Sequence, residues 1–103
     1  MKVYRGIRQN DGLTVLVNDQ ALDPRLDLRN HSPTGFECGY GGSGPAQLAL
    51  AILADHLQDD REALSLYQSF KWKVVSCLFP KGWELTSDQI DEALEFIRLE
   101  TVR

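Results

Sequence analysis

Hydrophobic and polar residues alternate along the first third of the chain, which predicts strands. Residues 3–7 and 13–18 are rich in strand-forming residues, and the second run places its aliphatic side chains on one face. Asp11-Gly12 lies between the two runs, and an Asp-Gly pair in that position is a strong signal for a β-hairpin. A weaker alternation at residues 25–40 predicts a second hairpin.

The pattern changes to a helical period near residue 44 and predicts a buried first helix. Gly44 or Ser43 is expected to cap this helix, with Pro45 in its first turn, where a missing N–H costs nothing. Gln47 is placed to reach back to the cap, as in a capping box. Residues 48–57 are apolar on nearly every side, so this helix should lie inside the domain.

Two more helices are predicted after the buried one. The second covers about residues 61–79 and stops at Pro80, and residues 83–85 form a short extended link. Thr86, with Gln89 three positions later, predicts a capping box at the start of the third helix. Because strands and helices are segregated along the chain, the fold class is α+β: N-terminal β-hairpins in a small antiparallel sheet, followed by three α-helices.

Composition adds size and location to this picture. At 103 residues, with 43% hydrophobic and 25% charged residues, the chain is expected to be a single domain, residues 1–103. The cysteines, Cys38 and Cys77, are too few for a disulfide framework, which favours reduced thiols and a cytoplasmic location. No targeting segment and no apolar run long enough for a bilayer is present, so no membrane role is expected.

Charge argues against nucleic acid as the main partner. The net charge is −4, and its acidic excess lies in the helical half. Sequence-independent binding of nucleic acid needs clustered Lys and Arg residues, and no such cluster is found. Two pairs of arginines still leave room for a nucleic-acid accessory protein with a local basic patch: Arg5, Arg8, Arg25 and Arg29.

A glycine-rich stretch before the buried helix is the densest polar segment of the chain. Residues 39–44 match G-x-G-x-x-G, but a helix follows where the dinucleotide-binding pattern needs a strand. One interpretation is structural, with glycines that let the chain turn sharply into the helix. The other is a site for an anion or small molecule at the helix N-terminus. Its candidate residues are Arg29, Asn30, His31, Gly41, Gly42, Ser43, Gly44 and Gln47.

No catalytic set can be assigned from the sequence. Cys38 and His31 are near enough in sequence to consider a thiolate–imidazolium pair, but Cys38 lies in an alternating apolar run, which favours a buried, inert thiol. Cys77 is predicted on the inward face of the second helix. The histidines and cysteines lack the paired spacing of a zinc site, so neither metal nor cofactor is expected.

Several large apolar residues fall outside the core stripes of the second and third helices. They pack against the protein's own sheet and loop, or they form an exposed patch for a protein partner or a second copy of the chain. These residues are Trp72, Val75, Phe79, Phe96 and Leu99.

The run SPTGF…GYGGSGPAQLAL, followed by LYQSFKWKVV and WELTSDQI, resembles a small family of uncharacterised prokaryotic and phage or plasmid proteins, a domain of unknown function. The resemblance covers nearly the whole chain. It implies a compact stand-alone domain, often in mobile-element settings, with no established activity, cofactor or catalytic residue. Cys38 stands where the family pattern has Trp, which further weakens a cysteine nucleophile.

Three classes of function therefore stay open. The leading hypothesis is a non-enzymatic binding protein that docks a partner macromolecule, in a phage or mobile-element setting. The second is an anion-binding or small-molecule-binding domain, which could be an enzyme, built on the glycine-rich stretch. The third is the nucleic-acid accessory protein.

Overall fold

The computed structural model describes residues 1–101 and contains one antiparallel sheet. Strands β1 (Val3–Gln9) and β2 (Gly12–Val17) form the predicted hairpin around Asp11-Gly12. The short strand β3 (Gln20–Ala21) pairs with β2, and β4 (Gly82–Thr86) pairs with the other edge of β1. The strand order is β3-β2-β1-β4.

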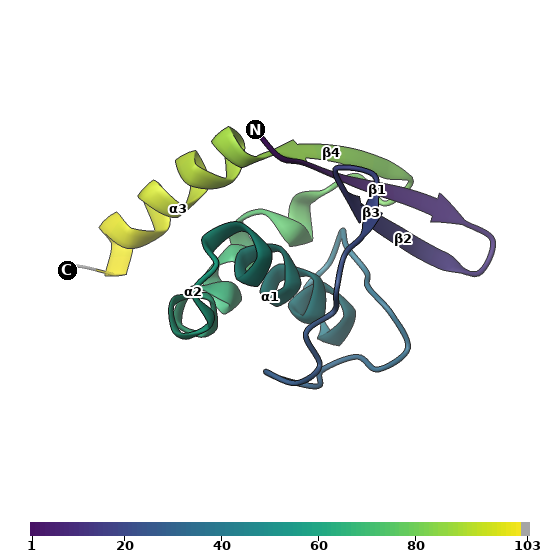
Figure 1. Cartoon of the computed structure of the whole chain (residues 1–103), viewed down its shortest axis with the longest axis horizontal. Coiled ribbons are helices and arrows are strands. Elements are labelled where there is room, and N and C mark those ends of the chain that lie inside the picture. The colour runs from purple at the N-terminus through teal and green to yellow at the C-terminus, as the bar shows by residue number, and fades with distance from the viewer. Residues whose placement is uncertain (102–103) are drawn as a thin grey trace.

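Three α-helices complete the described chain: α1 (Ser43–Leu57), α2 (Asp60–Lys73) and α3 (Ser87–Thr101). A short 3-10 helix, η1 (Val75–Cys77), follows α2. Figure 1 shows α1 and α2 together beside the sheet, and α3 running away from the end of β4. The predicted α+β class is confirmed. Within residues 1–101 no helix is both long and apolar enough to cross a membrane.

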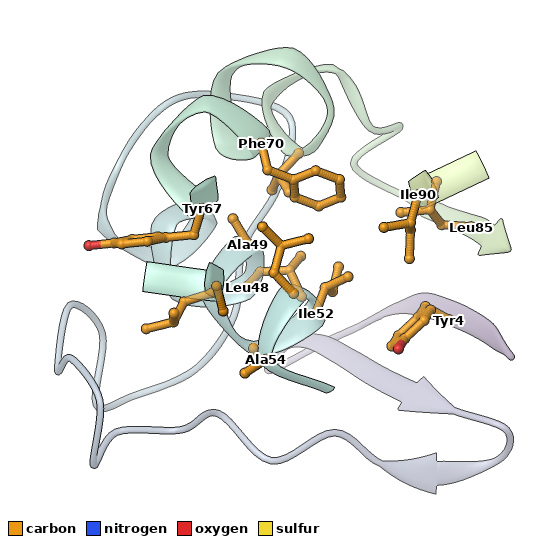
Figure 2. Packing of buried hydrophobic residues seen from close by; sticks show 14 of the residues in the cluster. Tyr4, Leu48, Ala49, Ile52, Ala54, Tyr67, Phe70, Leu85 and Ile90 are labelled. Atoms are coloured by element: carbon orange, nitrogen blue, oxygen red, sulfur yellow. The ribbon is translucent and has the colours of Figure 1, made fainter. Parts of the chain in front are cut away.

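Helix α1 is the centre of the core, as its nearly uniform apolar character predicts. Every residue from 44 to 54 is buried, so the helix has no solvent-facing side over three turns. Figure 2 shows Leu48 and Ile52 of α1 between Phe70 of α2 and Tyr4 of β1. Helix α1 packs on α2, and its Asp55 accepts a hydrogen bond from Tyr4 of β1, so α1 joins the two halves of the fold.

The second predicted hairpin, at residues 25–40, is not formed. Residues 22–42 are an irregular loop whose only ladder contact is one isolated bridge between Leu13 and Phe36. Arg25 explains part of the difference, because its φ of +54° turns the chain out of an extended path. Its side chain then binds Asp60 of α2 at 2.8 Å, which attaches the loop to the helices instead of to a strand.

Residues 83–85, predicted as an extended link, belong to the edge strand β4. The strand has only five residues and pairs with β1, a segment that precedes it by more than seventy positions. The local alternation is too short to reveal such a distant partner. The capping box that follows is confirmed, because Gln89 N donates to Thr86 Oγ1 at 3.2 Å and Thr86 N donates to Gln89 Oε1 at 2.9 Å.

The ends of α1 and α2 differ from the sequence expectation. Pro45 lies in the first turn of α1 as predicted, but the cap is Gly42, without a side-chain hydrogen bond. Helix α2 ends at Lys73 instead of residue 79, just before the β-branched pair Val74-Val75, which has a low helix propensity. The η1 turn that follows leaves Cys77 exposed, so its predicted inward position is wrong.

The pairing of β1 with β4 depends on a glycine beneath an indole ring. Gly6 lies opposite Trp83, and a Cβ added at Gly6 would stand 2.3 Å from the Trp83 ring. We expect Gly6→Ala to lower the free energy of unfolding by about 1–3 kcal/mol, because the ring must move out of a packed position. Urea unfolding measures this loss. When Trp83 is replaced by Leu, Gly6→Ala should cost much less free energy of unfolding than it does in wild type. If the effects of the two substitutions simply add, the contact between Gly6 and the Trp83 ring is contradicted.

Candidate functional site

Gln47 of α1 holds the loop that the sequence analysis considered either as a structural turn or as a ligand site. Its side chain is fully buried. Its Oε1 accepts hydrogen bonds from His31 N at 2.8 Å and Ser32 N at 3.2 Å. Its Nε2 donates to Pro24 O at 2.6 Å and Arg29 O at 3.1 Å. Both donors and both acceptor positions of the amide are therefore used inside the protein, so Gln47 neither closes a capping box nor offers a free N–H to a ligand.

The other predicted side chains from residues 29–31 do not converge on one ligand position. Arg29 is exposed, and its guanidinium donates to its neighbour's carbonyl, Leu28 O, at 2.8 Å. Asn30 is exposed. His31 Nε2 lies 2.7 Å from the Tyr67 hydroxyl, which connects the loop to α2. The structure thus brings His31 and Gln47 together through backbone contacts of the loop.

The glycines before α1 are covered by aromatic side chains. A Cβ added at Gly41 would stand 2.2 Å from the Trp72 ring, and one at Gly42 would stand 2.8 Å from the Tyr40 ring. Neither glycine has a positive φ, so the requirement here is close approach of a ring and not an unusual backbone angle. This geometry supports the structural interpretation of the glycine-rich stretch.

A carboxylate of the protein itself lies beside the first turn of α1. Glu37 packs on Gly44, where an added Cβ would stand 2.7 Å from Glu37 Cβ. The Glu37 carboxylate accepts two hydrogen bonds from Arg8, both at 2.8 Å. These bonds lower the pKa of Glu37 below its usual value, and the pair joins β1 to the loop. The start of α1 therefore already has an anionic group nearby, which makes it a poorer place for a bound anion.

A second polar cluster lies at the other end of α1, where the sequence analysis expected none. Asp55 Oδ2 accepts from the Tyr4 hydroxyl at 2.5 Å and from Lys2 Nζ at 3.0 Å. Burial, followed by this hydrogen bond, raises the pKa of Tyr4. A hollow of about 240 Å³ beside Asp55 is also lined by Arg25 and Asp60, which form an ion pair with each other. These contacts are between protein groups and fasten β1 and the loop to the helices.

The cysteines show no sign of a reactive site. Cys38 is 2% exposed, and burial raises the pKa of its thiol, so the predicted buried thiol is confirmed. Residues 1–101 contain no group of three or more His, Cys, Asp or Glu side chains arranged to hold a metal ion.

Large apolar side chains gather on the surface near the end of α2. Trp72 is 59% exposed and Phe79 64%, and Tyr40, which the sequence analysis did not single out, is 53% exposed. Val75 is fully buried, so it does not belong to the exposed patch considered from the sequence. The loop and the α2–η1 segment run together here, because Gly39 N donates to Val75 O at 3.0 Å. We call Tyr40, Trp72 and Phe79 the aromatic corner.

The outer side of α3 carries the other two predicted surface residues. Phe96 is 62% exposed and Leu99 64%, while Ile90, Leu94 and Ile97 on the opposite side are buried. The division follows the 3.6-residue period of the helix. Helix α3 therefore covers the core with one side and presents two large apolar side chains to solvent with the other.

These features describe a small α+β domain with a loop held to α1 by Gln47 and with large apolar side chains on its surface. Residues 4–96 match a family of unknown function (DUF6166), and the chain belongs to that family. A search of curated proteins and a search of solved structures found no match. The family membership agrees with the resemblance seen in the sequence and supplies no activity.

Replacing Gln47 should test its structural role. Gln47→Met keeps the side-chain length but leaves four partly buried backbone groups without their partner. We expect the free energy of unfolding to fall by about 2–4 kcal/mol, because unsatisfied buried polar groups are costly. Gln68→Met, at an exposed position on the same protein, is the matched control and should change little. Equal effects in chemical denaturation would contradict the role of Gln47.

The Arg8–Glu37 pair predicts a pH dependence of stability. Because the folded pKa of Glu37 lies below its unfolded value of 4.5, the pair stabilises the fold above that pH and loses this contribution as the pH falls through the folded pKa. The stability difference between wild type and Glu37→Gln should therefore shrink in acid. Thermal unfolding between pH 6 and about pH 3 measures it, and a constant difference across this range would refute the assignment.

Proposed function

We propose that this protein is a non-enzymatic binding protein that docks a partner macromolecule on its exposed apolar surface. The observation that carries the proposal is the placement of Tyr40, Trp72, Phe79, Phe96 and Leu99, each more than half exposed. Large apolar side chains that gather on a small domain mark an interaction surface more often than single scattered ones. Tyr and Trp are also enriched among the residues that dominate binding energy at interfaces.

The arrangement of the loop favours docking over the binding of a small ligand. The Gln47 amide is saturated, and the rings of Trp72 and Tyr40 cover the glycines at the start of α1. A pocket for a small molecule needs a concave space with free polar groups. At the glycine-rich stretch before α1, these contacts occupy the polar groups and the space that such a pocket would need.

The arginines considered for nucleic-acid binding are mostly engaged with carboxylates. Arg5 lies 3.4 Å from Glu84, Arg8 pairs with Glu37, and Arg25 bridges two aspartates. A guanidinium that already neutralises a protein carboxylate contributes less to the release of counterions from a phosphate backbone. A protein partner therefore fits the surface better, and a mobile-element setting, as the sequence resemblance suggests, would suit an adaptor of this kind.

Removal of the aromatic corner tests the proposal. The tagged chain is recovered from its source cells, and the macromolecules bound to it are quantified. Wild type is compared with the double variant Trp72→Ala/Phe79→Ala. The control is Leu26→Ser, because Leu26 is also a large apolar residue at the surface, 37% exposed. Loss of one central aromatic anchor costs about 2 kcal/mol or more, so specific partners should fall by about 30-fold or more in the double variant and stay with the control. Circular dichroism checks that all three proteins are folded. If all three then bind the same molecules, docking at this corner is refuted.

A further inference from the structure

The surroundings of the aromatic corner are basic, although the whole chain is acidic. Lys71 Nζ lies 4.3 Å from the centre of the Trp72 ring, a cation–π distance. Lys81 is exposed and follows Pro80, whose side chain packs on Gly39 of the loop. Within residues 1–101, neither lysine has a carboxylate partner. The corner thus combines exposed rings with two positive charges that no carboxylate of the described chain neutralises: Lys71, which is 9% exposed and lies against the Trp72 ring, and the exposed Lys81.

The outer side of α3 combines apolar side chains with negative charge. Glu92 lies one turn before Phe96, and Glu95 one turn before Leu99. Each pair also lines a shallow hollow, of about 260 Å³ at Phe96 and about 420 Å³ at Leu99. Both glutamates are exposed, and neither is ion-paired with a residue of the described chain. We call Glu92, Glu95, Phe96 and Leu99 the acidic face.

The aromatic corner and the acidic face adjoin each other across the groove between α2 and α3. Trp72 and Ile97 both line this groove, which has a volume of about 270 Å³. The ion pair between Lys73 and Glu100, at 2.7 Å, bridges the same two helices. Glu100 also lines the groove and lies one helical turn after Phe96, on the same side of α3. The basic and the acidic apolar regions are therefore neighbours on one continuous surface.

We infer that the partner is a second copy of this chain, docked with its acidic face on the aromatic corner; this inference rests on the proposed function. The two regions are complementary in charge and both are apolar, whereas either region placed against its own kind brings like charges together. Because both regions share one surface, a two-fold rotation forms both contacts at once. Such an interface closes as a dimer instead of growing into a chain.

A charge-exchange experiment tests the dimer. Light scattering after gel filtration, at micromolar to millimolar concentration and low salt, should give wild type a mass twice the 11.6 kDa of the chain. Two variants should each be at least tenfold weaker in self-association: Lys71→Gln/Lys81→Glu, which makes the corner negative, and Glu92→Lys/Glu95→Lys, which makes the α3 face positive. The control is Arg61→Glu, which changes the charge of an exposed residue at the other end of α2, away from the proposed interface, and should still dimerise.

The mixture of the two charge variants decides the arrangement. In a one-to-one mixture each altered corner meets an α3 face of opposite charge, so the heterodimer should form although each variant alone is monomeric. Lys81→Glu alone repeats the test at an exposed position if the double variant is unfolded. A monomeric wild type, a dimer that ignores both variants, or a mixture that stays monomeric overturns the inference. If wild type is monomeric but binds other macromolecules that Trp72→Ala/Phe79→Ala fails to bind, the dimer is wrong and the proposed docking function stands. If wild type is monomeric and the double variant binds the same macromolecules as wild type, both the dimer and the docking function are wrong.

Discussion

The structure depends on one buried amide near the start of α1, among buried apolar neighbours. Gln47 is fully buried, and its four hydrogen bonds satisfy backbone groups of a loop that forms no second hairpin. Such a loop can lie against the core only if its inward N–H and C=O groups find partners, because an unpaired buried polar group costs free energy comparable to a lost hydrogen bond. An aliphatic residue at this position would complete the apolar helix but leave the loop without its anchor.

Other polar contacts extend this fastening to the rest of the loop. Arg25 binds Asp60 at the start of α2, His31 contacts the Tyr67 hydroxyl, and Glu37 pairs with Arg8 of β1. The first two contacts join the loop to α2 and the third joins it to β1, so the loop is held against the helices at one end and against the sheet at the other. A surface ion pair contributes little by itself, but the buried amide already fixes the path of the chain, which lowers the entropy cost of each further contact.

Local sequence patterns predicted the parts of the fold that local physics determines. The Asp-Gly hairpin, the buried helix α1 and the capping box of α3 all depend on residues within a few positions of one another, and all three are present. Two of the errors arise where distant residues decide. Residues 83–85 become a strand because β1 is beside them, and the alternation at residues 25–40 is overridden by contacts with α1 and α2. The role of Gln47 was missed for the same reason. A glutamine at this position can either close a capping box or bind a distant loop from the core, and the local sequence does not distinguish the two.

The candidate surface shows the same division between local and distant information. Phe96 and Leu99 could be placed outside the core from the helical period alone, whereas Val75 could not, because the early end of α2 turns it inward. Tyr40 ended the alternating run at residues 25–40 that predicted a hairpin, and in the structure it is exposed with its ring over Gly42.

Under the proposed function, the glycines contribute to recognition without touching a partner. They let the Tyr40 and Trp72 rings approach closely to the backbone of a loop that Gln47 already holds in place. Rings supported in this way lose less conformational freedom on binding than rings that extend freely into water, so more of the energy of burying them is left for association. The loop and the aromatic corner therefore act together: the buried amide of Gln47 fixes the backbone, the backbone supports the rings, and under the proposed function the rings are what the partner contacts.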